Sequence, residues 1–125
     1  SIIMNIQELV TGKRLGTPVK VAIMNNMHLG MVRQWQELFY QKQYSEVDLS
    51  DNPDFAKVAE AFGCHGLTCT ERGQVDDVLK KARKFNDAPV FINFLCESAE
   101  NVYPMIPAGA SLSEIVYYPK EPELI

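Results

Sequence analysis

No apolar run in this sequence approaches the ~20 consecutive residues that a membrane-spanning helix needs. The first residues, SIIMNIQEL, lack the basic and apolar regions of a signal peptide. The three cysteines, Cys64, Cys69 and Cys96, are odd in number and form no CxxC pair, so we expect reduced thiols in the core. A net charge of −4 gives no basic footprint for nucleic acid. We therefore expect a cytoplasmic protein whose partners include neither a membrane nor a nucleic acid.

The remaining composition fits one domain. Of the 125 residues, 46% are hydrophobic, and a chain of this length buries roughly two thirds of the surface that it exposes when unfolded. No repeats, low-complexity tracts or interdomain linkers interrupt the chain. Residues 117–125 are rich in proline and glutamate, so we expect a domain over residues 1–116 and a tail over residues 117–125.

The stretch 18–40 organises the chain. Its first half, VKVAIM, is an almost unbroken apolar run and predicts a strand buried on both faces. The run breaks at Asn25 and Asn26, whose small amides are typical of a sharp exit from a strand. After Gly30 the apolar period becomes helical. The expected apolar stripe of this helix holds Met31, Val32, Trp35, Leu38 and Phe39, and the polar stripe holds Arg33, Gln34, Gln36 and Glu37.

Helices and strands alternate along the rest of the chain. Helices are expected over residues 2–14, 53–62, 71–85 and 111–116, and strands over residues 65–69 and 89–95. Asn52 and Thr70 are the expected caps of the second and third of these helices. The first is expected to bury Ile2, Ile6, Leu9 and Val10, and the third Val75, Val78, Leu79 and Ala82. This alternation predicts an α/β fold with a parallel sheet.

The loop of residues 25–30 carries the first hint of chemistry. In an open parallel sheet, ligands bind at the carboxyl ends of strands. An asparagine oxygen and a loop carbonyl are neutral ligands that suit Mg²⁺ where a diphosphate already supplies negative charge. Gly30 permits close approach of the backbone, and the following helix directs its N–H groups toward an anion. Taken alone, an Asn–Asn pair is more often a plain turn, and a lone histidine such as His28 is more often a solvated or core residue.

Four segments of the sequence resemble the catalytic subunit of the acetolactate synthase (acetohydroxyacid synthase) family. They are SIIMNIQEL, PVKVAIMNNMHLGMVRQWQELFY, DLSDNPDFAKVAEAFG and NVYPMIPAGASLSEIV. The resemblance runs in register over nearly the whole chain, and only residues 117–125 fall outside it. It implies a three-layer α/β/α fold with a mainly parallel sheet, in which residues 1–116 are the carboxyl-terminal portion of the domain that binds thiamine diphosphate.

The resemblance also implies a cofactor site. In the family a GDG triplet would directly precede Ser1, and its aspartate would bind Mg²⁺ together with the Asn26 side chain and the His28 backbone. The implied cofactor-binding residues are Ser1, Asn26, Met27, His28, Leu29, Gly30 and Met31. No catalytic side chain is implied here, because the activating glutamate belongs to the first domain of a neighbouring subunit. The FAD of the intact enzyme would bind outside these residues as well.

The implied reaction belongs to branched-chain amino acid biosynthesis. Pyruvate is decarboxylated on thiamine diphosphate, and the enamine condenses with pyruvate or 2-ketobutyrate. The family works as a homodimer or homotetramer, with a possible regulatory small subunit. Because the triplet and the activating glutamate lie outside these 125 residues, we expect this chain to be a fragment that is inactive by itself.

Substrate selection within the family is implied for Met31, Val32, Trp35 and Ala108, which would line the substrate channel. The helical period alone favours a core position for Trp35 instead. Ala108 departs from the serine of plant relatives, which bears on inhibitor sensitivity. Two alternatives stay open. The chain could belong to another thiamine-diphosphate enzyme, of the pyruvate oxidase or glyoxylate carboligase type, or it could be a noncatalytic α/β interaction or nucleotide-binding module.

Some further residues suggest ordinary structural roles. His65 and Cys69 lie on one expected strand, and we interpret them as core filling rather than a metal pair. A run of basic side chains in the third helix is expected to face solvent. It comprises Lys80, Lys81, Arg83 and Lys84.

Overall fold

The computed structural model describes residues 1–118, so most of the expected tail at 117–125 lies outside the described residues. The chain divides into two compact units. The first comprises Ser1–His28 and Asp48–Ser98, and the second comprises Leu29–Val47 and the described residues from Ala99 onward. None of the helices within residues 1–118 has the length and apolarity of a membrane span.

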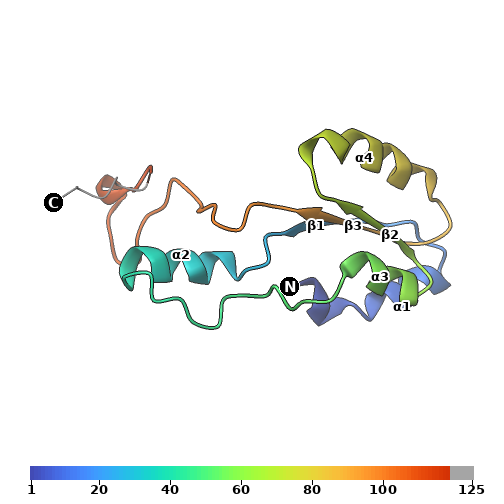
Figure 1. The fold of residues 1–125 in the computed structure, drawn as a ribbon, viewed down its shortest axis with the longest axis horizontal. Coiled ribbons are helices and arrows are strands. Elements are labelled where there is room, and N and C mark those ends of the chain that lie inside the picture. Colours follow the sequence, from blue (N-terminus) through green and yellow to red (C-terminus); the bar gives the residue numbers. More distant parts are fainter. Residues whose placement is uncertain (119–125) are drawn as a thin grey trace. The chain divides into compact units, whose positions relative to one another are not determined.

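A parallel three-stranded sheet forms the centre of the first unit (Figure 1). Its strands are β1 (Lys20–Asn25), β2 (His65–Cys69) and β3 (Val90–Leu95), in the order β1-β3-β2. In this register Ile23 lies beside Asn93, and Leu67 lies beside Ile92. The parallel sheet and the bounds of β2 confirm the expectations from the sequence.

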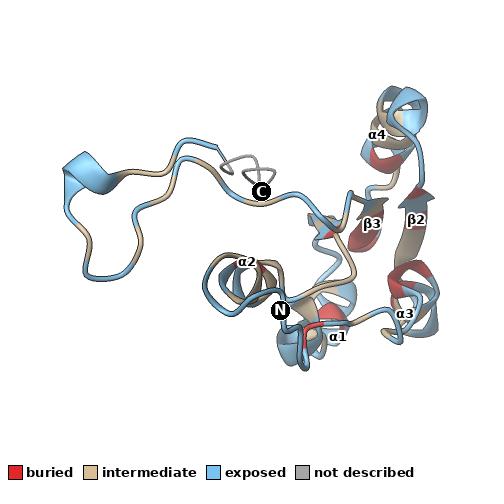
Figure 2. Cartoon of the chain, turned by 60° about the vertical axis from the view of Figure 1, so that its left-hand side comes forward, coloured by how far each residue is buried: buried red, intermediate tan, exposed pale blue. Residues whose placement is uncertain are grey.

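One face of the sheet is covered by the amino-terminal helices and α3 (Figure 2). The chain begins with a 3-10 turn, η1 (Ile2–Asn5), and continues into α1 (Glu8–Arg14), while α3 (Phe55–Ala61) precedes β2. The core on this face comprises Leu9, Ala59, Cys64 and Phe91, with Ile2, Ile6, Val21, Ile23 and Phe62 packed against it. Gly66 allows α3 to lie this close, because a Cβ there would collide with the backbone of Ala56.

The opposite face is covered by α4 (Val75–Lys84), which follows the 3-10 turn η2 (Arg72–Gln74). The core there comprises Leu67, Ala82, Val90 and Ile92, with Val78, Leu79, Phe85 and Phe94 packed against it. The basic side chains of α4 are exposed, as expected. With helices on both faces the unit has three layers, which confirms the α/β/α expectation.

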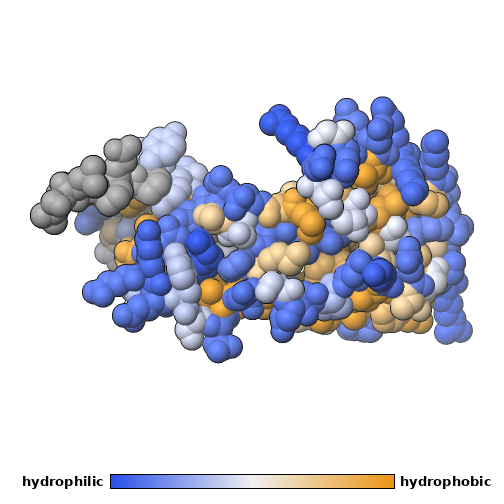
Figure 3. All heavy atoms as spheres, viewed as in Figure 1, coloured by the Kyte–Doolittle hydropathy of each residue, from blue (hydrophilic) through white to orange (hydrophobic). Residues whose placement is uncertain are grey.

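The expectation that β1 is buried on both faces is wrong. Along β1 the side chains alternate, and Met24 is 69% exposed while Val21 and Ile23 are partly buried. The reason is the strand order, since β1 lies at an edge of the described sheet and α4 packs over β2 and β3. Figure 3 shows the resulting apolar surface over the sheet beside α4.

Several helix ends also differ from expectation. Asp54 caps α3, accepting hydrogen bonds from the N–H groups of Ala56 and Lys57, so Asn52 is not the cap and Pro53 lies outside the helix. Thr70 does not cap α4; its N–H and hydroxyl instead donate to Gln74 Oε1. The helix expected over residues 2–14 is a 3-10 turn followed by α1. Val10 in α1 is 53% exposed rather than buried.

The second unit is built on α2 (Gly30–Phe39). Its carboxyl-terminal segment forms a loop that closes where Met105 and Val116 exchange backbone hydrogen bonds of 2.9 and 2.8 Å. A 3-10 turn, η3 (Leu112–Glu114), replaces the longer helix expected at 111–116, and Ser111 and Glu114 form a capping box there. This loop contains Ala108.

Candidate functional site

The loop after β1 leaves the sheet through two consecutive asparagine turns. Asn25 is buried, and its Oδ1 accepts a hydrogen bond of 3.1 Å from the Met27 N–H. The Asn25 carbonyl accepts a second bond of 2.9 Å from the Cys96 N–H, which ties the loop to the end of β3. Met27 takes the left-handed conformation, with φ at 58°, which non-glycine residues adopt rarely. The loop is therefore held in a specific, strained shape rather than a simple bend.

Asn26 and His28 form the second turn. Asn26 Oδ1 accepts a bond of 3.2 Å from the His28 N–H, and the His28 ring contacts the Asn26 carbonyl through Nδ1 at 3.1 Å. The imidazole is therefore engaged with its own loop. The expectation that His28 acts through its backbone stays a prediction.

A backbone bridge fixes the direction of the His28 carbonyl. His28 lies opposite Asp48 in an antiparallel bridge, in which the Leu49 N–H donates to the Met27 carbonyl at 2.8 Å. The Leu29 N–H donates to the Val47 carbonyl at 2.9 Å. Because these neighbours make the bridging bonds, the N–H and C=O of His28 itself point away from Asp48. The His28 carbonyl is thus directed to the same side of the chain as its N–H, which meets Asn26 Oδ1.

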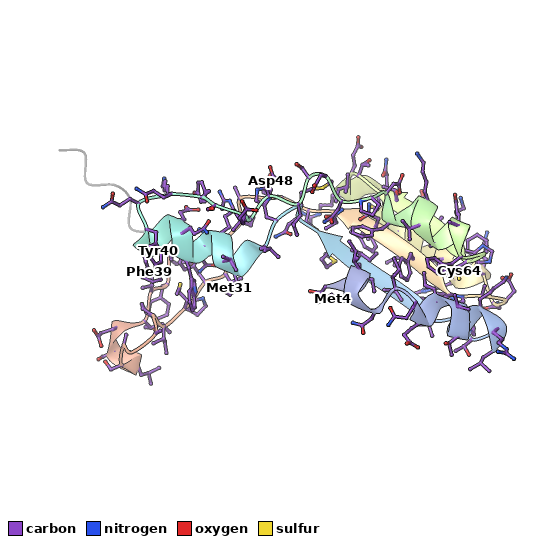
Figure 4. The ribbon with its side chains drawn as sticks, turned by 90° about the horizontal axis from the view of Figure 1, so that it is seen from below. Met4, Met31, Phe39, Tyr40, Asp48 and Cys64 are labelled. Carbon is purple, nitrogen blue, oxygen red and sulfur yellow. The ribbon has the colours of Figure 1, made fainter. Side chains whose placement is uncertain are left out.

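Asp48 is a charged neighbour of this loop (Figure 4). Hydrogen bonds from Ser50 lower the pKa of its carboxyl group, and His28 lowers it further by a smaller amount. The carboxylate is therefore ionised at neutral pH. It places a negative charge opposite His28 in the backbone bridge.

The helix that follows begins at Gly30 without a side-chain cap. Leu29 occupies the N-cap position and offers no acceptor for the N–H groups of the first turn. The helix has ten residues. The uncapped N–H groups of its first turn, together with the partial positive charge at its amino-terminal end, can bind an anion. Loop and helix start follow one another directly in the chain, as the sequence predicts.

The amino terminus lies on the same side of the first unit as the carboxyl ends of the strands (Figure 1). Ser1 is exposed, and its carbonyl accepts a bond of 3.1 Å from the Met4 N–H. Among the expected cofactor-binding residues, Ser1, Asn26, Met27 and His28 therefore belong to one end of the first unit. Leu29, Gly30 and Met31 follow at the start of the second unit.

The donor set limits what metal could bind. Within the described residues, no cluster of three or more histidine, cysteine, aspartate or glutamate side chains could hold a metal ion. The loop offers two neutral oxygens, Asn26 Oδ1 and the His28 carbonyl. These fit a hard cation such as Mg²⁺ only where phosphate oxygens and a further carboxylate complete the shell.

The apolar stripe of α2 is open. Met31, Val32 and Trp35 are 51%, 49% and 47% exposed, so Trp35 is not a core residue of its unit. Figure 4 shows Met31 near the start of α2 and Phe39 and Tyr40 at its end. A pocket of about 260 Å³ lies against this helix, lined by Val32, Trp35, Gln36, Tyr40 and Gln43. Ala108, the fourth expected channel residue, is exposed on its loop.

Gln34 is the residue that the sequence analysis missed. It was expected on the polar, solvent-facing stripe of α2, yet it is 1% exposed and bonded to Val102. The faces of α2 are thus reversed in this unit, with the polar stripe partly covered and the apolar stripe open. The sequence offered one signal: two glutamines, Gln34 and Gln36, whose amides can bond to a backbone segment packed on the helix. Hydrophobic periodicity alone assigns such residues to solvent.

Residues 1–94 match the family described as thiamine pyrophosphate enzyme, C-terminal TPP binding domain, and this chain belongs to that family. Acetolactate synthases are among its relatives. This chain is 51% identical over 116 residues to the acetolactate synthase large subunit IlvB1 of Mycobacterium tuberculosis, and the alignment covers 90% of this chain and 19% of that protein. It is 47% identical to the acetolactate synthase isozyme 2 large subunit of Escherichia coli, covering 93% and 21%. The chain thus spans about a fifth of the length of these relatives.

Proposed function

We propose that this chain is the part of an acetolactate synthase large subunit that holds the diphosphate end of thiamine diphosphate and its Mg²⁺. The observation that carries the proposal is the loop of residues 25–30, where two asparagine turns and an uncapped helix start follow the carboxyl end of β1. The identity to acetolactate synthase subunits supports the choice of enzyme within the family.

Each part of the loop has a role in this proposal. Asn26 Oδ1 and the His28 carbonyl bind Mg²⁺, and the N–H groups at the start of α2 bind the diphosphate. We expect Ser1, Met27, Leu29 and Met31 to bind the cofactor as well. Asn25 shapes the turn without binding the metal, because its side chain is buried where it accepts the Met27 N–H, whereas Asn26 is only partly buried.

When bound, thiamine diphosphate supplies the electron sink for decarboxylation of a 2-ketoacid. The residues of this chain bind and orient it, and they contribute no general base. The substrates in the proposal are pyruvate, and pyruvate or 2-ketobutyrate as the second ketoacid. Met31, Val32, Trp35 and Ala108 line the path to the site. The open stripe of α2 supports this, because its apolar side chains are free to meet a small ketoacid.

The complete activity in this proposal needs more than these residues. An aspartate for the metal, a glutamate from a neighbouring subunit and FAD bound in another domain complete the enzyme, which assembles as a homodimer or homotetramer and accepts a regulatory subunit. We expect the 125-residue chain alone to form no acetolactate and to bind thiamine diphosphate weakly.

The proposal is tested with the full-length protein that contains this sequence. With pyruvate, thiamine diphosphate, Mg²⁺ and FAD, it should produce acetolactate, while the 125-residue chain under the same conditions should produce none. Acetaldehyde as the main product, acetyl phosphate when phosphate and oxygen are supplied, or tartronate semialdehyde when glyoxylate replaces pyruvate would instead assign the protein to another thiamine-diphosphate enzyme. Calorimetric titration of the short chain with cofactor and Mg²⁺ supplies the second half of the test, since micromolar affinity would show that the other residues are dispensable.

A further inference from the structure

We propose that Gln34 is a positioning residue, which fastens the loop carrying Ala108 to the helix carrying Trp35 and so sets the preference for the second ketoacid. This inference rests on the proposed function. It goes beyond the proposed function by assigning a role in selectivity to a buried side chain that is not among the expected channel residues.

The Gln34 amide pairs with the backbone of Val102 on both sides. The Val102 N–H donates to Gln34 Oε1 at 2.7 Å, and Gln34 Nε2 donates to the Val102 carbonyl at 3.0 Å. The second N–H of Nε2 meets Met105 Sδ at 2.9 Å. Both N–H groups and the oxygen of the amide thus have partners. A buried amide is tolerated only when it is satisfied in this way, so its partners are held in a fixed geometry.

The contacts of Gln34 lie at the base of the loop that contains Ala108. Met105 is one of its partners, and Met105 also closes that loop by pairing with Val116. Between them the chain turns through Gly109, whose φ of 83° suits glycine. Fixing Val102 and Met105 to α2 therefore fixes the root of the Ala108 loop relative to the helix.

The same contacts orient α2. Residues 34 and 35 are neighbours, so their side chains point about 100° apart around the helix axis. Because the Gln34 side is bound to Val102, the Trp35 side remains open, and Trp35 stays 47% exposed. An apolar residue at position 34 removes the polar contacts that keep the Gln34 face of α2 against Val102 and the Trp35 face open. One amide thus connects the helix to the base of the loop, and these two segments carry the expected channel residues.

Gln36 provides a matched comparison on the same helix. Its Nε2 donates to the Ser45 carbonyl at 3.0 Å, and its Oε1 accepts from the Ser45 N–H at 3.2 Å. The chemistry is the same as at Gln34, but the segment held is residues 40–47 rather than 99–106. Loss of Gln34 should loosen only the segment around Val102, whereas a general loosening of α2 would also free the segment around Ser45. Comparing the two segments therefore distinguishes these effects.

The contact is tested by hydrogen exchange on the full-length protein. Gln34→Met keeps the length and helix propensity of the side chain but removes its donors and its oxygen. Exchange in the peptide containing Val102 should accelerate at least tenfold while the peptide containing Ser45 is unchanged, and Gln36→Ala should give the reverse pattern. Unchanged exchange at Val102 in Gln34→Met overturns the proposal. If Gln34→Met does not fold, Gln34→Glu is used, which retains an acceptor for the Val102 N–H but sets an oxygen against the Val102 carbonyl.

Selectivity is tested by competition between pyruvate and 2-ketobutyrate in the same variants. An apolar pocket distinguishes one methylene by a factor of about 10–200, so a loosened wall should lower the preference for one ketoacid several-fold. Turnover with pyruvate alone and affinity for thiamine diphosphate should be retained in Gln34→Met. An active wild type with an unaltered product ratio in Gln34→Met overturns the role of Gln34. A wild type that forms no acetolactate overturns the proposed function instead, and with it the selectivity assigned to Gln34.

Discussion

Two contacts join Asn26 and His28: the His28 N–H donates to Asn26 Oδ1, and the His28 ring contacts the Asn26 carbonyl through Nδ1. The side chain of Asn26 is thereby fixed over the backbone of His28. Two oxygens that could bind one cation are linked before any cation arrives. Preorganisation of this kind reduces the conformational entropy lost on binding.

The cap of α3 yields a prediction that compares two neighbouring residues. Asp54 accepts two backbone N–H groups at the helix start, whereas Asn52 lies before the helix and serves as no cap. Asp54→Ala should lower the free energy of unfolding by about 1 kcal/mol, the usual cost of losing an N-cap. Asn52→Ala, the control, should change it by much less. Thermal unfolding of both variants measures this, and equal losses would contradict the cap assignment.

The hydrogen-bond pattern of β1 predicts that proline destabilises the protein much more at one position than at its neighbour. The Val90 N–H donates to the Val19 carbonyl and the Cys96 N–H to the Asn25 carbonyl, so odd-numbered residues of β1 bond to β3. Ile23→Pro removes one of these bonds and should cost about 1–3 kcal/mol. Ala22→Pro places proline on the edge side, where the described sheet makes no bond, and edge strands tolerate it. Chemical denaturation should rank Ile23→Pro well below Ala22→Pro in stability.

Trp35 gives a prediction that separates channel from core. Replacing a core tryptophan by leucine costs on the order of 2–4 kcal/mol. Because Trp35 is about half exposed in its unit, we expect Trp35→Leu in the full-length protein to stay folded and active. Its preference for 2-ketobutyrate should fall, and inhibitors that block the channel should bind more weakly. A large drop in melting temperature with an unaltered product ratio would return Trp35 to a core role.

Much of the first unit could be predicted from the sequence because local pattern and burial agree there. The stripe of α4 and the bounds of β2 follow directly from periodicity. The burial of β1 could not be predicted, because strand order decides it and strand order depends on contacts distant in sequence. The cap of α3 was misplaced because Asn52 and Asp54 are both good capping residues and lie two positions apart.

For the candidate site, the strand–loop–helix pattern is confirmed, whereas the ligands assigned to it stay predictions. The sequence favoured residues 25–30 as a ligand loop, and the structure adds the turns that aim its oxygens. The assignment of metal and channel residues came from the resemblance to a family and stays a prediction. The burial of Gln34 was not predicted, because periodicity assigns polar residues to solvent. Its amide is instead hydrogen-bonded to the backbone of a segment 68 positions away.

The metal site offers the most direct test of the account. Thiamine diphosphate binding to the full-length protein is measured by calorimetry over a range of Mg²⁺ concentrations, for the wild type, Asn26→Ala and Asn25→Ala. Asn26→Ala should need at least about tenfold more Mg²⁺ for half-saturation, with partial rescue at high Mg²⁺, as expected for loss of a metal-site residue. Asn25→Ala should lower the melting temperature and leave the Mg²⁺ requirement near that of the wild type, because the Asn25 side chain is buried in the turn and shapes it from within. An unchanged Mg²⁺ requirement in both variants would contradict the account.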